Sequence, residues 1–344
     1  MEYRLLPIFT FLNLVLVATH AALPPEVYWK SVLPTTPMPK AITDTLYPDF
    51  VEEKGTSVNV GKGSGVNVHA GKGGGTNVNV GGGKGGGVHV STGHKKGKPV
   101  HVSVGPKYKS PFDYVYAATE TQLHDDPNVA FFFLEKDLHP GTKLNLQFTK
   151  TSNQATFLPR QVADSTPFSS NKLDSILTKF NVKPGSEEAR IMENTIRECE
   201  ESGIKGEEKY CATSLESMVD FSTSKLGKNV EVVSTEVDGK ETGLQKHTTI
   251  APGVKKLGGN KAVVCHKQSY PYAVFYCHKT ETTKAYSVPL ESDDGIRVKA
   301  VAVCHTDTSQ WNPKHLAFQV LKVKPGTVPV CHFLPEDHVV WLPK

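Results

Sequence analysis

The chain has 344 residues, of which 38% are hydrophobic and 22% are charged, enough for one large or two modest domains with a buried core. The formal net charge is +4. The stretch from Gly55 to Gly105 contains six lysines and no acidic residue, so its own charge of +6 is larger than that of the whole chain. Nucleic-acid-binding domains concentrate basic charge on folded surfaces among aromatic residues, whereas this charge lies in a glycine tract. The composition therefore argues against nucleic acid as a partner.

Residues 1–22 have the pattern of a secretory signal peptide. Arg4 precedes an apolar run from Leu5 to Val17, and small residues follow as far as Ala22. Thirteen apolar residues are too few to span a bilayer comfortably, and no second run of spanning length follows. We therefore expect a secreted protein without a membrane span, cleaved after Ala21 or Ala22.

Two segments of contrasting composition follow. Residues 23–54 form a short proline-bearing arm, in which Tyr28 and Trp29 either stand exposed or dock the arm onto the folded domain. Residues 55–105 are a degenerate repeat of Val-x-Val units that holds 17 of the 29 glycines. Each unit resembles a strand, but none carries enough apolar surface to offset the entropy of ordering its glycines. We expect a flexible, cationic Gly/Val/Lys tether that can form transient β-structure.

Residues 106–130 lead into a folded domain at 131–344. Residues 131–148 predict a strand, a His-Pro-Gly turn and a second strand. Serine caps and helical periodicity then predict three helices. They run from Ser169 or Ser170 to about Phe180, from Ser186 to Cys199, and from about Ala212 to Ser224.

The rest of the chain, from Val230 onward, has the period-two pattern of strands separated by turns. The predicted strands are VEVVSTEV, KAVVCHK, YAVFYCHK, KAYSVPL, RVKAVAVCH, LAFQVLKV, TVPVCHF and HVVWL. Helices clustered before strands predict an α+β fold, not alternating α/β.

Six cysteines in a secreted chain favour disulfides, although six cysteines allow fifteen pairings. Cys199 and Cys211 bracket the connection between two predicted helices, where a disulfide closes easily. The other four cysteines each precede a histidine, with gaps of ten, 25 and 25 residues between the pairs. These pairs are Cys265-His266, Cys277-His278, Cys304-His305 and Cys331-His332.

Adjacent residues on a strand point to opposite faces, so each pair sends its sulfur to one side and its imidazole to the other. If the four strands are neighbours, the cysteines can pair on one face while the histidines converge on the other. Neutral imidazole is a common metal ligand, and an all-imidazole site suits copper or zinc. The alternative is that the histidines are polar surface residues beside disulfides. A thiolate zinc site is disfavoured by the cysteine spacing and by an oxidising compartment.

The four Cys-His pairs and their spacing resemble the signature of the plant BURP domain, and the Phe-Phe pair within Phe131–Phe133 matches the usual start of that domain. The resemblance covers the whole chain: signal peptide, short N-terminal segment, repeats and C-terminal domain. The repeats TSVNVGKGSGVNVHAGKGGG and the block YAATETQLHDDPNVAFFFLEKDLHPGTKLNLQF are similar to the dehydration-responsive subgroup. The resemblance implies a β-rich, disulfide-stabilised domain.

The first function implied by the resemblance is non-enzymatic. Members of the subgroup are described as stress-responsive proteins of the apoplast or cell wall, and some relatives act with expansins or peroxidases. A cationic tether suits weak, salt-sensitive attachment to acidic pectin, although it also suits a mere spacer. The final destination stays open between the wall and the storage vacuole.

The second implied function is that of a copper-dependent peptide cyclase, which cross-links a Tyr or Trp side chain within its own core peptide. By position, His266, His278, His305 and His332 would be the copper ligands, with His139 as an extra candidate. The four paired cysteines would form disulfides, together with Cys199 and Cys211. No Gln-Pro-aromatic core peptide is present, and the substrate candidates that remain are Trp29, Tyr47, Tyr114 and Tyr116.

No other enzyme class finds support in the sequence. A Gly-x-Ser-x-Gly elbow, a His-Glu-x-x-His motif and a P-loop are all missing. The paired acids Asp125-Asp126 and Asp293-Asp294 lie in turn-like contexts, which explains them better than catalysis does. We therefore assign no catalytic residue.

Overall fold

The computed structural model describes residues 24–46, the backbone of four strands between 66 and 103, residues 132–144 and 146, and residues 155–238, 248–280, 282–293 and 295–344. The predicted signal peptide at 1–22 and the segment at 106–130 lie outside the described residues. No helix in the described part of the chain is long and apolar enough to cross a membrane.

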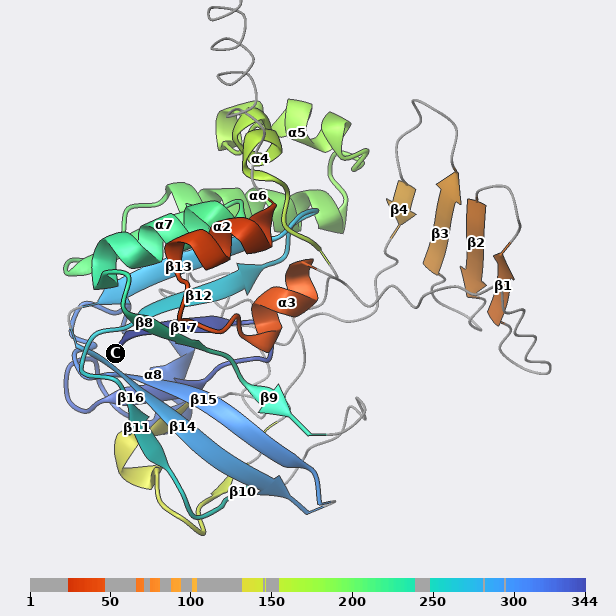
Figure 1. Ribbon diagram of the computed structural model, residues 1–344. Coiled ribbons are helices and arrows are strands. Elements are labelled where there is room, and N and C mark those ends of the chain that lie inside the picture. The colour runs from red at the N-terminus through yellow and green to blue at the C-terminus, as the bar shows by residue number, and fades with distance from the viewer. Residues whose placement is uncertain are drawn as a thin grey trace, which may run out of the picture.

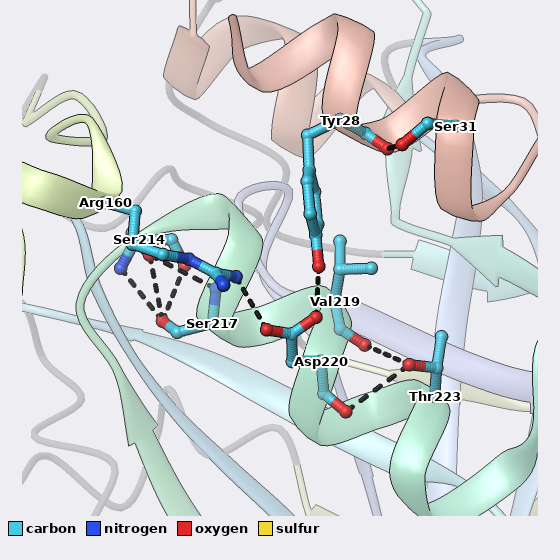
Figure 2. Close-up of polar contacts among 8 residues, drawn as sticks. All are labelled: Tyr28, Ser31, Arg160, Ser214, Ser217, Val219, Asp220 and Thr223. Atoms are coloured by element: carbon cyan, nitrogen blue, oxygen red, sulfur yellow. Dashed lines mark hydrogen bonds and ion pairs between the residues drawn. The ribbon is translucent and has the colours of Figure 1, made fainter. Parts of the chain in front are cut away.

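Helices gather at one end of the domain (Figure 1). They are α2 (Pro25–Val32), α3 (Lys40–Leu46), α4 (Arg160–Ser165), α5 (Leu173–Lys179), α6 (Glu187–Glu200) and α7 (Leu215–Leu226). Ser186 caps α6 as predicted, because its hydroxyl accepts a hydrogen bond from Ala189 N at 3.2 Å. At the start of α7, Ser214 and Ser217 form a reciprocal capping box, which is visible in Figure 2.

Two helix boundaries differ from the prediction. Neither Ser169 nor Ser170 caps α5, which begins at Leu173 after a 3₁₀ turn. The Ser169 hydroxyl instead donates to Glu200 at 2.6 Å, so it joins this turn to the end of α6. The third predicted helix starts three residues late because Ala212 ends a strand, β7 (Glu207–Ala212), that the sequence pattern did not reveal.

Two antiparallel sheets form the rest of the domain. The five-stranded sheet has the order β7-β13-β12-β17-β8. In the eight-stranded sheet the path is β5-β16-β15-β14-β10-β6, with β9 paired to β15 and β11 paired to β14. The strands not yet located are β5 (Phe132–Leu134), β6 (Lys143–Leu144), β8 (Val230–Val233), β9 (Glu236–Val237), β10 (Thr248–Ile250), β11 (Lys255–Leu257), β12 (Val263–Gln268), β13 (Val274–Thr280), β14 (Thr283–Ser292), β15 (Arg297–His305), β16 (Val330–Phe333) and β17 (Val339–Pro343).

The two sheets pack face to face around a buried aliphatic cluster. Val264 and Val340 from the five-stranded sheet meet Val301 and Val303 from the eight-stranded sheet. The outer face of the five-stranded sheet is covered by α7 and by the N-terminal arm. Helices at 160–226 followed by antiparallel strands agree with the predicted α+β class.

One predicted strand is wrong. LAFQVLKV contains the helix α8 (Leu316–Leu321), preceded by His315, whose side chain accepts a hydrogen bond from Ala317 N at 3.1 Å. Leu316, Ala317 and Phe318 are all buried, and Ala317 and Phe318 pack with Trp311 and Val330. Lys322 ends α8 in the left-handed conformation, with φ at 55°.

The two strands predicted within 131–148 exist, but they pair with distant strands. β5 lies beside β16, with Phe133 opposite Cys331, and β6 lies beside β10. The strands are separated by a 3₁₀ turn at Glu135–Asp137 and by the His-Pro-Gly turn. The N-terminal part of the domain thus supplies two edges of the eight-stranded sheet.

The described backbone of the repeat region contains strands, and the flexible tether stays a prediction. Its backbone forms a four-stranded antiparallel sheet from β1 (Val66–Ala70), β2 (Gly75–Val80), β3 (Val88–Gly93) and β4 (His101–Ser103). The register places valine opposite valine, as in Val68 with Val78 and Val90 with Val102. The valines of the Val-x-Val units thus lie opposite one another across the antiparallel strand pairs.

Candidate metal centre

The four Cys-His pairs lie on two neighbouring strand pairs, one in each sheet. In the five-stranded sheet Cys265 is directly opposite Cys277, and in the eight-stranded sheet Cys304 is directly opposite Cys331. Each opposed pair forms a disulfide, and Cys199 bonds to Cys211 as the third bridge. The structure thus selects one of the fifteen pairings that the sequence left open.

The cysteines and histidines alternate across each sheet as a strand requires. Cys265 and Cys277 pack with α7 and the arm on the outer face, and Cys304 and Cys331 lie in the cluster outside the other sheet. The histidines that follow them therefore point inward, between the sheets. His266 and His278 come from the five-stranded sheet, whereas His305 and His332 come from the eight-stranded sheet.

The four imidazoles form a closed circle of contacts. Ring centres are 5.3 Å apart for His266 and His278, 6.0 Å for His278 and His305, 5.5 Å for His305 and His332, and 5.9 Å for His332 and His266. All four side chains are at most 1% exposed. The sequence-based alternative, polar histidines on the surface, is therefore wrong.

Three of the histidines have a partner at Nδ1, the nitrogen on the backbone side of the ring. His278 Nδ1 lies 3.1 Å from Glu207 Oε1, His332 Nδ1 lies 3.2 Å from the carbonyl oxygen of Phe333, and His266 Nδ1 lies 3.0 Å from His338 Nδ1. A partner that accepts a proton from Nδ1 leaves the Nε2 lone pair for a metal. The Nε2 atoms of His266 and His278 are 3.2 Å apart.

Burial keeps His266, His305, His332 and His338 neutral. It lowers the pKa of His332 to about 3 and that of His338 to about 4, both below the ordinary 6.5. Burial and the neighbouring imidazoles hold the pKa of His266 and that of His305 well below 6.5. Neutral imidazole is the form that ligates metals, so His266, His305 and His332 are in the protonation state that a metal site needs at neutral pH.

Glu207 is the anionic partner of the cluster. Burial alone would raise the pKa of its carboxyl group, but the contact with His278 and the hydrogen bond from Ile204 N at 3.1 Å lower it below the usual 4.5. Tyr276 Oη also donates to Glu207 Oε1 at 3.2 Å. A buried carboxylate behind a histidine is the arrangement that orients imidazole ligands in metal sites.

The donor set fits a metal ion of the copper or zinc type, but the ring positions are not yet those of a bound site. Two nitrogen ligands on one tetrahedral ion lie about 3.3 Å apart and their ring centres about 5 Å apart, close to the separations seen for His266 and His278. Within the described residues, no three His, Cys, Asp or Glu side chains are already placed to hold a metal ion together.

Aromatic side chains enclose the histidines. Trp311 lies with its ring centre 5.1 Å from that of His305 and 4.8 Å from that of His315, and Tyr276 lies 5.5 Å from His278. Trp311 and His315 are at most 4% exposed. These residues, Glu207 and His338 escaped the sequence analysis because no motif marks them; the strand period of β7 was the one available signal for Glu207.

Other residues singled out from the sequence lie elsewhere. His139 is exposed in its turn, where it contacts Thr142 at 3.2 Å. Trp29 is 2% exposed and packs on Trp341 beneath the arm, on the cysteine side of the five-stranded sheet. Tyr47, Tyr114 and Tyr116 lie outside the described residues. The arm is therefore docked by Trp29, and this tryptophan does not face the histidines.

Comparison with known proteins identifies the domain. The family model described as "BURP domain" matches residues 131–343. The chain is 52% identical to "BURP domain protein RD22" of Arabidopsis thaliana over 98% of each protein. It is 43% identical to BURP domain-containing protein 5 of Oryza sativa subsp. japonica over 94% of this chain and 88% of the relative. Rice BURP domain-containing protein 3 is 59% identical over 67% of this chain and 55% of its own length.

The four Cys-His pairs, the family match and the full-length similarity to RD22 lead to one conclusion: the chain belongs to the plant BURP-domain family, in its dehydration-responsive subgroup.

Proposed function

We propose that this protein is secreted and acts in the apoplast or cell wall during dehydration and related stress, through interactions and not as an enzyme. The observation that carries the non-enzymatic assignment is the closure of the histidine cluster. Its four rings are at most 1% exposed, and Trp311 and His315 cover them. Closed metal sites are structural, whereas catalytic sites keep a position open for substrate.

The partner class follows from charge. The lysines of the repeat segment carry the positive excess of the chain, and acidic pectin is the wall polymer of opposite charge. Wall-modifying proteins such as expansins or peroxidases are the proposed protein partners. Attachment through the charges of these lysines is screened by salt, so it should be weak at high ionic strength.

Deletion of the repeat segment tests the attachment. The mature protein and a variant without residues 55–105 are added to isolated wall material and extracted with increasing salt. We expect the intact protein to stay bound at low salt and the deletion variant to wash off. Equal extraction of the two proteins would contradict attachment through this segment, and a variant with the six lysines changed to glutamine separates charge from length.

We further propose that His266, His278, His305 and His332 hold a copper ion in the domain. The support is the convergence of four buried imidazoles from both sheets, with Glu207 behind one of them. His278→Ala combined with His305→Ala should abolish stoichiometric copper binding, measured by isothermal titration and metal analysis. His139→Ala is the matched control, because this histidine is exposed in its own turn. Unchanged binding in the double variant would refute the site.

A copper-dependent peptide cyclase is the second candidate, and the aromatic rings beside the histidines favour it. Copper would supply one-electron oxidation of an aromatic side chain, and Trp311 and Tyr276 are the aromatic residues held next to His305 and His278. Each cross-link removes two hydrogen atoms, and dioxygen from air is the electron acceptor. Trp29 packs on Trp341 at the cysteine side of the five-stranded sheet, away from the histidines, and this position counts against it as a substrate.

Intact mass separates the two candidates. The mature chain is loaded with copper in air, and its disulfides are reduced and alkylated before measurement. Loss of paired hydrogens, located by fragmentation to a Tyr or Trp, would establish self-cyclisation. An unchanged mass despite copper uptake would exclude self-cyclisation under those conditions and leave the interaction-based function.

A further inference from the structure

The N-terminal arm, residues 24–46, is part of the hydrophobic core although the family match begins only at residue 131. Trp29, Leu33 and Ile42 are at most 2% exposed, and they pack with Trp341 and Phe275 on the outer face of the five-stranded sheet. Apolar side chains of this size, fully buried, are the strongest single contributors to an interface.

Polar contacts fix the arm in one position. Trp29 Nε1 donates to Thr36 O at 2.9 Å, and Thr36 Oγ1 donates to Val230 O at 2.6 Å. These bonds tie the turn after α2 to the edge strand β8. Phe157 N donates to Thr45 O at 3.4 Å, so the end of α3 is attached as well.

A charged contact anchors α2 to α7 at the surface. Figure 2 shows Tyr28 pointing from α2 to Asp220 on α7, with Arg160 of α4 on the other carboxylate oxygen. Arg160 Nη2 lies 2.6 Å from Asp220 Oδ2, and its guanidinium carbon lies 5.1 Å from the Tyr28 ring centre. These contacts therefore fix the position of α2 along α7 as well as its distance from that helix.

We infer that the arm is a built-in ligand for the outer face of the five-stranded sheet, which remains bound when its covalent connection to the domain is cut. The connecting residues 47–131 then begin and end on one folded unit. The lysine-rich segment at 55–105 is therefore part of a long loop whose two ends are anchored in the same domain. It does not connect that domain to a second, separate domain. A protease that cuts this loop leaves the protein in one noncovalent piece.

A single engineered cut tests the inference in the full mature chain. A specific protease site is inserted between Glu53 and Lys54. The N-terminal fragment produced by cleavage then contains the arm but none of the strands β1–β4. After cleavage the sample is passed over a gel-filtration column at about 1 μM and at both low and high salt. We expect the arm fragment to elute with the domain under both conditions, as identified by mass.

Substitutions in the arm test whether its buried side chains are responsible for binding to the domain. Trp29→Ala should weaken retention at least about 100-fold in dissociation constant, because it removes the largest buried side chain of the arm. Val27→Ala is the matched control, since Val27 is on the same helix and is 47% exposed. Release of the wild-type arm under native conditions would overturn the inference, and so would retention at low salt alone. Near-ultraviolet circular dichroism of the cut protein verifies that the domain stays folded.

Discussion

At the scale of the residue, the second-sphere partner of His278 carries the most information about the metal centre. Glu207 and Glu208 are neighbours on β7, but Glu207 points to the buried histidine whereas Glu208 is exposed and pairs with Lys225 and Lys279. The two residues have the same side chain and adjacent positions in the sequence, and they differ in whether the carboxylate reaches the histidine. Substituting each in turn therefore isolates the effect of that contact.

We predict that Glu207→Gln weakens copper binding about 10- to 100-fold, because the carboxylate orients the ring and makes it more basic. Glu208→Gln should leave the affinity unchanged. Isothermal titration measures both, and the copper absorption and electron paramagnetic resonance spectra should change only in Glu207→Gln. Identical affinities in the two variants would show that Glu207 has no positioning role. Circular dichroism spectra of both variants show whether either substitution unfolds the domain.

At the scale of the element, the turn after β5 is joined to β14 by one carboxylate. Glu135 accepts hydrogen bonds from Lys284 Nζ at 2.8 Å and from Tyr286 Oη at 2.5 Å. Burial raises the pKa of Glu135, but these two donors outweigh it and the net pKa lies below the usual 4.5. The contact thus secures the edge of the sheet that lies beside His332.

Because this pKa is depressed, the stabilisation is present above about pH 4.5 and is lost as the pH falls through the folded-state pKa. We predict that Glu135→Gln lowers the free energy of unfolding by about 1–2 kcal/mol at pH 7. The difference from wild type should shrink as the pH falls below 4.5 and through the folded-state pKa. Urea unfolding at each pH measures it, and a difference independent of pH would show that the charge of Glu135 contributes nothing.

At the scale of the whole molecule, the histidines join the two sheets. Two ligands come from each sheet, so an ion bound by all four would connect halves of the sandwich that otherwise meet through valine packing. Binding to the folded state alone raises stability by mass action, by about 2.7 kcal/mol when free ligand is 100 times the Kd. The disulfides act within each sheet and do not supply this connection.

We predict that copper raises the melting temperature of the mature protein in a single cooperative transition. The His278→Ala, His305→Ala variant should show no increase, while His139→Ala should behave as wild type. Scanning calorimetry with and without copper checks the prediction. A similar increase in the double variant would place the stabilising copper elsewhere.

The sequence alone determined the chemistry and the local pattern. Strand alternation at each Cys-His pair predicted sulfur on one face and imidazole on the other, and this holds because side-chain direction in a strand depends only on the backbone. Ser186 gave the start of α6 for a similar reason, since a cap satisfies backbone donors that are adjacent in the chain.

The tertiary structure decided what depends on contacts between distant residues. The cysteine partners, the meeting of histidines from two sheets and the approach of Glu207 arise from strand order, which no local pattern encodes. The helix α8 stands where a strand was predicted, and its Ala317 and Phe318 pack with Trp311 and Val330 in a cluster that only the fold assembles. Local rules fixed where each side chain points, and long-range packing fixed what it meets.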